Sequence, residues 1–103
     1  MKQMGNIPMK QGILFMVNDH FVYMLKCKDN TLYTGYTTDV AHRLMVHESG
    51  KGAKYTRGRG PFELVYLETL ASKGDALRRE MQIKKLPREA KLSLVATYQR
   101  NDD

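Results

Sequence analysis

The chain has 103 residues, of which 42% are hydrophobic and 27% are charged, and its 17 Lys and Arg against 11 Asp and Glu give a formal net charge of +6. This length and balance predict one globular domain with a single modest core, and they exclude a disordered chain. The positive charge suits a polyanionic partner such as nucleic acid, although a basic protein that binds nothing anionic has the same composition.

Cys27 is the only cysteine, which excludes an intrachain disulfide and a zinc site built from thiolates. The longest apolar run near the N-terminus, residues 12–17, is too short to span a bilayer, and no small-residue cleavage site follows it. We therefore expect a cytoplasmic protein that is neither exported nor bound to a membrane.

Residues 1–20 carry four of the methionines and show no clean periodicity. An upstream start codon, a loose arm and a helix that forms on a partner all fit this pattern. We expect a flexible N-terminal arm over residues 1–20, because termini that are not tied into the core are usually poorly ordered. The folded domain is expected over residues 21–98, followed by a short tail over residues 99–103.

Two short segments, 21–27 (FVYMLKC) and 31–36 (TLYTGY), are rich in aromatic and β-branched residues and flank the turn-forming sequence KDN. This pattern predicts a β-hairpin. A two-residue loop would place Tyr23 and Tyr33 on opposite faces of the hairpin, whereas a three-residue loop places both phenols and Gly35 on one face. We expect the odd-length loop.

The rest of the chain alternates between helical and extended patterns. The predicted elements are a helix over 40–49 with an N-cap among residues 37–39, a glycine-rich basic loop over 50–61, a strand over 62–70, a helix over 73–85 opened by Ser72 and Asp75, and a helix over 88–98 after the break at Leu86-Pro87. The order of elements is ββαβαα, in one small domain.

Arg43 and His47 are four positions apart on the first helix, so they project from the same side. Helical periodicity centres the buried arc on Val40, Ala41 and Leu44, with Met45 also at an apolar position and the Arg43/His47 pair at the edge of the arc. From the edge, both side chains can reach a cleft. The spacing alone favours the alternative, a solvated basic flank.

Glu80 falls inside the apolar arc of the helix over 73–85, which also contains Ala76, Leu77, Met81 and Ile83. A carboxylate on an apolar face is costly unless it is paired, protonated or bound to a metal. A functional carboxylate and a rim carboxylate that pairs with a nearby Lys or Arg therefore both remain open. Glu63 and Glu68, on the third strand, are expected to face solvent.

The loop over 50–61 offers cationic and hydroxyl groups around one aromatic ring, which suits binding to phosphates. Gly35 removes a side chain where a backbone or ligand could approach closely. The predicted DNA-binding residues are Gly35, Lys51, Lys54, Tyr55, Thr56, Arg57 and Arg59.

Val22-Tyr23 and Tyr33-Thr34-Gly35, followed by Arg43, His47 and a helical Glu80, resemble in order and spacing the GIY-YIG nuclease domain. Residues 49–66 (SGKGAKYTRGRGPFELVY) are similar to a group of small single-domain bacterial proteins, the YhbQ/YazA-like group.

This resemblance implies an α+β fold with a three-stranded antiparallel sheet flanked by helices, and hydrolysis of DNA phosphodiesters with one divalent ion, Mg²⁺ or Mn²⁺. Glu80 would be the metal ligand, and Tyr23 or Tyr33 would assist the attacking water. Arg43 would stabilise the phosphate, and His47 would orient a tyrosine or contact the phosphate. By the same resemblance, the glycine of the second motif would leave room for the backbone of the DNA.

The expected partner is DNA, including branched or nicked DNA, and the expected oligomeric state is a monomer. Relatives of this nuclease domain add further DNA-binding domains or use a partner protein. Two alternatives therefore stay open beside the nuclease: a non-catalytic nucleic-acid-binding module, and a subunit that depends on a protein partner.

Overall fold

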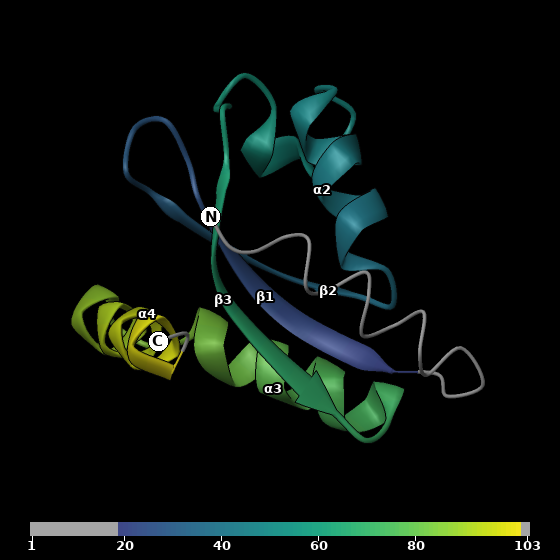
Figure 1. The fold of residues 1–103 in the computed structure, drawn as a ribbon, viewed down its shortest axis with the longest axis vertical. Helices are drawn as coiled ribbons and strands as arrows, with labels where there is room; N and C mark the ends of the chain where they lie inside the picture. Colours follow the sequence, from purple (N-terminus) through teal and green to yellow (C-terminus); the bar gives the residue numbers. More distant parts are fainter. Residues whose placement is uncertain (1–18, 102–103) are drawn as a thin grey trace.

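The computed structural model describes residues 19–101, which form a three-stranded antiparallel sheet with helices on both faces (Figure 1). The elements are β1 (His20–Lys26), β2 (Leu32–Thr37), α2 (Val40–Glu48), the 3₁₀ turn η1 (Lys54–Thr56), β3 (Glu63–Leu70), α3 (Lys73–Lys84) and α4 (Arg88–Asn101). This arrangement confirms the predicted α+β fold and the order ββαβαα; within the loop over 50–61, only η1 is helical.

The boundaries at the two ends of the domain differ from the predicted ones. β1 begins at His20, inside the predicted arm, and α4 continues to Asn101, inside the predicted tail. The prediction of a flexible arm over residues 1–20 otherwise lies outside the described residues. None of the described helices is long and apolar enough to cross a membrane.

The hairpin loop has the predicted odd length. The Cys27 N–H donates to the carbonyl of Thr31 at 2.9 Å, and the Asn30 N–H donates to the carbonyl of Cys27 at 2.9 Å, so three residues form the loop. Asn30 has φ 68°, in the left-handed region that asparagine tolerates better than most residues. A three-residue loop that ends on a left-handed residue is a common hairpin connection.

The register of the hairpin follows from this loop. Tyr23 pairs with Gly35, and Leu25 pairs with Tyr33, so odd positions pair with odd positions. Both predicted tyrosines and Gly35 therefore lie on the same face of the sheet, as the sequence predicts.

The central strand β1 pairs with β2 on one side and with β3 on the other. Every residue of β1 from Phe21 to Leu25 is buried, which accounts for the continuous apolar run in the sequence. A register irregularity opposite β3, between Met24 and Leu25, interrupts the pairing. β2 has one neighbouring strand and forms an edge of the sheet.

Polar side chains cap the helices where the sequence predicts caps. Asp39 accepts a hydrogen bond from the His42 N–H at 3.0 Å and begins α2. Ser72 accepts from the Asp75 N–H at 3.1 Å and begins α3. These bonds satisfy backbone donors that have no partner inside the helix.

The two faces of the sheet carry different cores. On the face covered by α3 and α4, called the α3/α4 face below, the buried cluster consists of Val22, Met24, Val65, Tyr66, Ala76, Ile83 and Val95. On the face covered by α2, called the α2 face, the buried hydrophobic cluster is limited to Phe21 and Val40 among the described residues, with Leu64 and Leu67 packed against it.

The prediction that three apolar helix residues are buried is wrong, because the buried face of each helix is narrower than the arc that its apolar residues span. Met45 on α2 is 63% exposed, and Leu77 and Met81 on α3 are 40% and 57% exposed. On α3 the buried positions are Ala76 and Ile83, which are seven apart, so the inward stripe passes through position 80 and leaves positions 77 and 81 outside.

Glu68 is also not the solvent-facing residue that the sequence predicts. Its Oε1 accepts a hydrogen bond from the Tyr66 hydroxyl at 2.6 Å and one from Arg79 Nε at 2.9 Å. Arg79 comes from α3, so this half-buried pair links β3 to the helix above it. Glu63 is exposed as predicted and lies 3.7 Å from Lys26.

Candidate active site

Tyr23 lies at the centre of the candidate site because β1 is the middle strand and its odd positions face α2. Tyr23 is 3% exposed and crosses over Gly35, its partner on β2. A Cβ atom at position 35 would lie 2.5 Å from the Tyr23 hydroxyl oxygen, closer than side chains approach. The expectation that Gly35 leaves room for a DNA backbone is therefore not met, because the Tyr23 phenol fills that room.

Three further rings form a chain of contacts beside this phenol, those of Tyr33, His47 and Tyr55. The ring centroid of Tyr33 lies 6.3 Å from that of Tyr23, 5.3 Å from that of His47 and 5.9 Å from that of Tyr55, on which it stacks. Tyr33 is half-buried, and its hydroxyl has no hydrogen-bond partner among the described residues. The structure thus brings both predicted tyrosines to one site and leaves the second hydroxyl free for a ligand.

His47 is 2% exposed, so the solvated basic flank that its spacing favours is wrong for this residue. Its Nε2 lies 2.9 Å from the Tyr23 hydroxyl, and its Nδ1 lies 2.9 Å from the Thr56 hydroxyl. Both ring nitrogens are engaged within the protein, which fits the predicted orientation of a tyrosine and leaves no nitrogen for a phosphate. Gly52 is needed here, since a Cβ atom at that position would lie 2.3 Å from His47 Nδ1.

The hydrogen bonds around His47 fix which nitrogen carries the proton. The Thr56 hydroxyl donates to the carbonyl of Ala53 at 2.8 Å, and a carbonyl can only accept. The Thr56 oxygen therefore accepts from His47 Nδ1–H, which leaves the Nε2 lone pair to accept from the Tyr23 hydroxyl. The pKa of His47 is lowered by burial and by the charge of Arg43, which favours this neutral form.

The two phenols lie in the field of the same charges. Burial is the largest cause that raises the pKa of Tyr23; Arg43 lowers this pKa and Glu80 raises it. Burial also raises the pKa of Tyr33, which Lys84 and Arg43 lower and Glu80 raises. Both phenols therefore stay protonated at neutral pH, and Arg43 and Glu80 act on both of them electrostatically.

Arg43 and Glu80 approach the tyrosines from opposite faces of the sheet. Arg43 is exposed on α2, one turn before the buried histidine. The Glu80 side chain on α3 is 17% exposed, and its Oε2 lies 3.1 Å from Lys84 Nζ. Of the two readings left open for Glu80, its position at the rim with a lysine partner is thus observed. Within the part of the chain that is described, no group of three His, Cys, Asp or Glu side chains could hold a metal ion.

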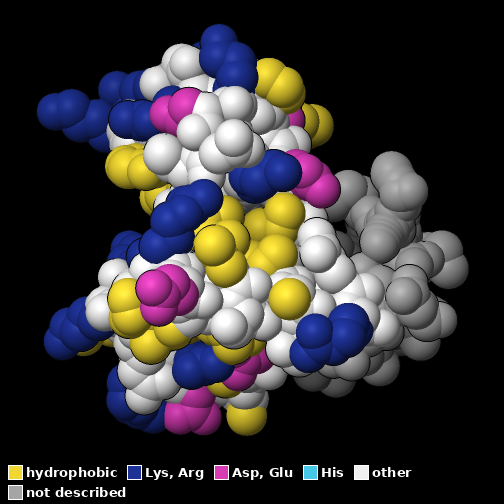
Figure 2. Space-filling model, turned by 90° about the vertical axis from the view of Figure 1, so that its left-hand side faces the viewer, with side chains coloured by type: hydrophobic (Ala, Val, Ile, Leu, Met, Phe, Trp, Pro, Cys, Tyr) yellow, Lys and Arg dark blue, Asp and Glu magenta, His cyan; other side chains and the backbone are white. Residues whose placement is uncertain are grey.

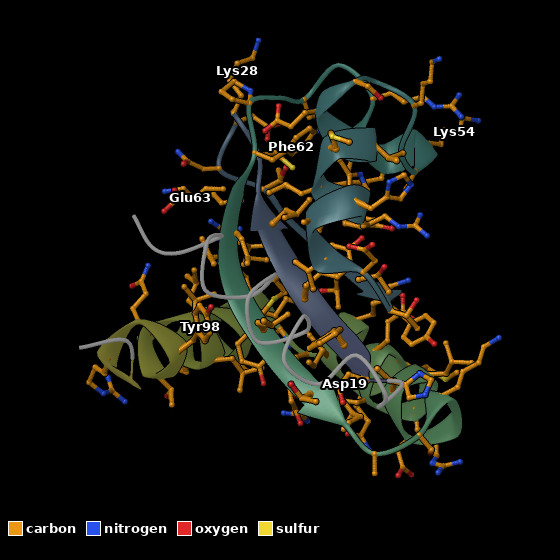
Figure 3. The ribbon with its side chains drawn as sticks, turned by 45° about the vertical axis from the view of Figure 1, so that its right-hand side comes forward. Asp19, Lys28, Lys54, Phe62, Glu63 and Tyr98 are labelled. Carbon is orange, nitrogen blue, oxygen red and sulfur yellow. The ribbon has the colours of Figure 1, made fainter. Side chains whose placement is uncertain are left out.

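The basic loop divides into exposed and engaged residues. Lys51, Lys54 and Arg57 are exposed, and Lys54 points away from the domain (Figure 3). Arg59 is engaged within the protein, at 2.6 Å from Asp29 and 4.6 Å from the centre of the Tyr55 ring.

Thr56 is the predicted DNA-binding residue that the structure contradicts most clearly. It is 1% exposed, and its hydroxyl is committed to His47 and to the carbonyl of Ala53. The hydroxyl faces inward because η1 turns the loop at this point. Thr56 therefore supports the histidine and cannot contact DNA.

Sequence reasoning missed Gly52 and Lys84 as residues of this site, and it assigned Thr56 to DNA contact instead of to the support of His47. Gly52 and Thr56 lie in a segment whose glycines and cations indicate only a loop, so their contacts with a histidine on another element leave no signal. Lys84 does have a local signal, because it follows Glu80 by four residues on a helix.

Figure 2 shows Lys and Arg side chains along the upper and left borders of a hydrophobic patch, with Asp and Glu side chains at two places beside it. Together with the net charge of +6, this distribution suits a polyanion larger than a single phosphate.

The family model for the GIY-YIG catalytic domain matches residues 19–93. Among known proteins, the chain is 55% identical over 80 residues to a UPF0213 protein of Oceanobacillus iheyensis, which covers 78% of this chain and 93% of the relative. It is 57% identical over 81 residues to a UPF0213 protein of Natronomonas pharaonis, covering 79% of this chain and 95% of the relative.

Two solution NMR structures are similar to the fold. A UPF0213 protein from Bacillus halodurans has a TM-score of 0.52 at 56% identity and covers 77% of this chain and 84% of its own. A protein from E. faecalis has a TM-score of 0.56 at 37% identity and covers 79% of this chain and 86% of its own.

Proposed function

The chain belongs to the GIY-YIG family, and on this premise we propose that it is an endonuclease that hydrolyses DNA phosphodiesters with a divalent metal ion. One observation carries the proposal: the Tyr23 hydroxyl donates at 2.9 Å to a histidine that is held neutral, with its free lone pair toward the phenol. A phenol has an ordinary pKa near 10 and is a poor base at neutral pH unless a neighbour takes its proton. His47 is that neighbour.

The reaction can be written with this relay. A water oxygen attacks phosphorus, and the bond from phosphorus to the leaving oxygen breaks. The water gives a proton to the Tyr23 oxygen while Tyr23 gives its own proton to His47 Nε2. The histidine then carries the positive charge, and its Nδ1–H remains bonded to Thr56. The leaving oxygen takes a proton from solvent.

The remaining side chains position the water and offset charge. The Tyr33 hydroxyl, which no described residue binds, is available to hold the attacking water. The Arg43 guanidinium offsets the negative charge that gathers on the phosphate in the transition state.

Glu80 is the one carboxylate that would hold a divalent ion at this site, and the ion would be shared with the substrate. Mg²⁺ is commonly bound through one or two carboxylates, with water and substrate phosphate oxygens completing its shell. Glu80 can supply one carboxylate, in competition with Lys84 at 3.1 Å. When bound, Mg²⁺ or Mn²⁺ would supply positive charge that offsets the negative charge of the reacting phosphate.

We also propose that Lys51, Lys54 and Arg57 contact DNA phosphates, because these cations are exposed beside the candidate site. The proposed setting is DNA repair or processing in the cytoplasm, by a monomer. A protein partner, which would dock on Leu86 and α4, is the alternative for a domain of this size.

The test is a cleavage assay on nicked, flapped and branched DNA with Mg²⁺ or Mn²⁺. Tyr23→Phe should lower the rate about 10²- to 10⁴-fold, the usual contribution of general acid–base catalysis. Glu80→Gln should abolish cleavage, whereas DNA binding in EDTA stays within about twofold, because one neutralised carboxylate changes little in a basic interface. Glu63→Gln, an exposed glutamate on β3, is the matched control and should cleave like the wild type.

Thermal melts test the alternative of a purely structural role for Glu80. The melting temperature of Glu80→Gln should stay near that of the wild type, since Lys84 is 51% exposed and can turn to solvent. A wild type that binds DNA and cleaves none with either metal would contradict the nuclease and leave a non-catalytic binding module.

A further inference from the structure

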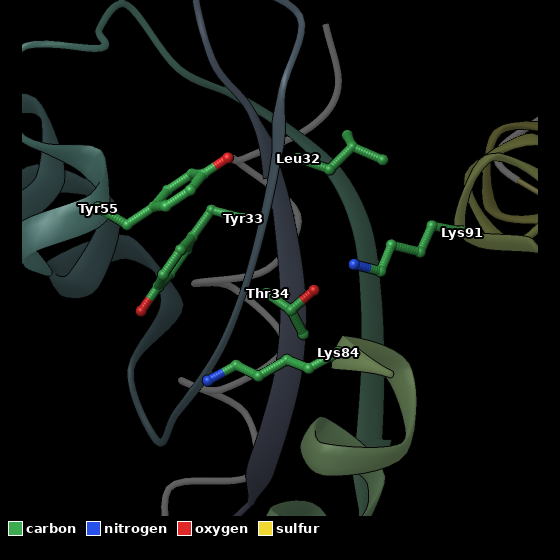
Figure 4. A pocket seen from close by; sticks show the side chains of 6 residues that line it. All are labelled: Leu32, Tyr33, Thr34, Tyr55, Lys84 and Lys91. Carbon is green, nitrogen blue, oxygen red and sulfur yellow. The ribbon is translucent and has the colours of Figure 1, made fainter. Parts of the chain in front are cut away.

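An open cavity of about 360 Å³ lies at the outer edge of β2 (Figure 4). Its lining consists of Leu32, Tyr33, Thr34, Tyr55, Lys84 and Lys91. Tyr33 faces the α2 side of the sheet, whereas its two neighbours on β2 face the α3/α4 side, so the cavity wraps around the edge strand. Tyr33 also belongs to the candidate active site, so the cavity borders that site.

The Thr34 hydroxyl is the first sign that this cavity takes a ligand. Thr34 is 4% exposed, and no group among the described residues hydrogen-bonds its hydroxyl. A buried hydroxyl without a partner is costly, so most are satisfied. In Figure 4 the Thr34 hydroxyl is turned toward the side from which Lys91 enters the cavity, where a ligand atom could bond to both.

The described charged residues that line the cavity are two lysines, of which Lys84 also pairs with Glu80 at 3.1 Å. Lys91 on α4 is half-buried and has no ion pair with any described carboxylate, and Lys84 extends from α3 beneath Thr34. Among the residues that the structure describes, no Asp or Glu lines the cavity. β2 also has one neighbouring strand, so alternate backbone N–H groups along its outer edge face away from the sheet. The cavity therefore offers cations and hydrogen-bond donors, which suit an anion with several acceptor oxygens.

We propose that this cavity is a second phosphate subsite, in which Lys91 and the Thr34 hydroxyl hold the phosphodiester next to the scissile one on the same DNA strand. The assignment rests on the proposed function, since it takes the scissile phosphate to lie at Tyr23 and Tyr33. A strand that continues from that position along the edge of β2 passes into the cavity, where Tyr55 and Leu32 can pack against its sugar. The subsite would fix the register of the strand relative to the Tyr23 hydroxyl.

The experiment measures binding in EDTA, so that no strand is cut. The ligand is a nicked DNA duplex, in which the nick sets the register, with one phosphate at a time near the nick replaced by a neutral methylphosphonate. In the wild type, one replacement beside the scissile position should weaken affinity about tenfold, since a phosphate held by a lysine adds a counterion-release and a hydrogen-bond contribution. In Lys91→Gln the same replacement should have no further effect.

The control is Lys73→Gln. It removes an exposed lysine at the start of α3, which does not line the cavity, and it should keep the full methylphosphonate effect. An equal effect of the replacement in Lys91→Gln and in the wild type would overturn the subsite and leave the nuclease proposal intact. A wild type that shows the methylphosphonate effect but cleaves no DNA with Mg²⁺ or Mn²⁺ would contradict the nuclease proposal alone. A wild type that binds no DNA in EDTA would overturn both.

Thr34→Val separates a binding role from a structural one. Valine has nearly the same shape as threonine and removes the unpaired hydroxyl, so the melting temperature should be equal to or above that of the wild type. The affinity for unmodified nicked DNA should nevertheless fall severalfold, and the methylphosphonate effect should shrink. A Thr34→Val protein that binds like the wild type would remove the hydroxyl from the subsite.

Discussion

The α3/α4 face and the α2 face of the sheet contain the same kind of secondary structure but bury different chemistry. The α3/α4 face packs aliphatic side chains from β1, β3, α3 and α4 into one cluster. The α2 face has a small apolar cluster beside a buried polar chain, Tyr23, His47 and Thr56. Burial of apolar area is the main source of stability, so the α3/α4 face contributes most to the stability of the fold. The α2 face contains the buried polar chain that we propose as the proton path.

β1 connects the two faces, because its successive side chains point in opposite directions. Val22 and Met24 enter the aliphatic cluster, and Tyr23 between them enters the polar chain. The central strand, which pairs with a strand on each side, therefore carries the phenol. This position limits the movement of the Tyr23 hydroxyl relative to the sheet. The comparison predicts that stability and catalysis respond to different substitutions.

The largest effect on stability is expected on the α3/α4 face. Ile83 is fully buried, and Ile83→Ala should lower the free energy of unfolding by about 2–5 kcal/mol, through lost apolar contact and the cavity left behind. Urea unfolding measures this loss. Leu77→Ala, on the same helix at a position 40% exposed, is the control and should cost less than about 1 kcal/mol. Cleavage per folded molecule should persist in both variants. A selective loss of cleavage in Ile83→Ala would contradict the idea that the two faces contribute separately to stability and catalysis.

A smaller loss of stability with a large loss of activity is expected on the α2 face. Gly35→Ala places a Cβ atom 2.5 Å from the Tyr23 hydroxyl, so the phenol must move away from His47. Overpacking of this kind costs about 1–3 kcal/mol, and cleavage should fall as far as in Tyr23→Phe.

Gly74→Ala is the matched control, because a Cβ atom there meets nothing closer than 3.6 Å. It should leave activity unchanged and change stability by less than about 1 kcal/mol, in the stabilising direction. A fully active Gly35→Ala protein would show that the position of the Tyr23 phenol does not matter for the reaction.

The smallest effect is a pH dependence of stability that belongs to the α2 face. The pKa of His47 is lower in the folded chain than its ordinary value of 6.5. The unfolded state therefore binds more protons below about pH 6.5, and stability falls on acidification, by at most about 1.4 kcal/mol per pH unit for one proton. Urea unfolding between pH 5 and 8 should show a weaker acid dependence in His47→Gln. His42→Gln, at an exposed position on the same helix, should keep the wild-type slope, and an equal slope in both variants would remove His47 as the cause.

Local patterns predicted the sheet better than the site. The three-residue loop and the alternation of Tyr23, Tyr33 and Gly35 depend on neighbours in sequence, so the register could be predicted. The burial of His47 could not, because its partners lie 24 and 9 positions away and the spacing along α2 only indicates an edge position.

Glu80 is intermediate between these cases. Its place on the inner stripe of α3 followed from the helical period, and the pairing with a nearby lysine was one of the two readings. The helical pattern does not predict how narrow the buried arc is, because this width depends on the close packing of α3 against β1 and β2. The helical pattern therefore predicts Leu77 and Met81 in the core, although both side chains are exposed.

The ion pair between Lys84 and Glu80 makes the two proposed ligands thermodynamically dependent on each other. A divalent ion that takes the Glu80 carboxylate releases the Lys84 ammonium toward the cavity at β2, and a phosphate that takes the ammonium releases the carboxylate. By linkage, each ligand must then lower the dissociation constant of the other by the same factor. If both proposals hold, Lys84 would act as an exchangeable internal counterion, which neutralises the carboxylate until the metal and the strand bind together.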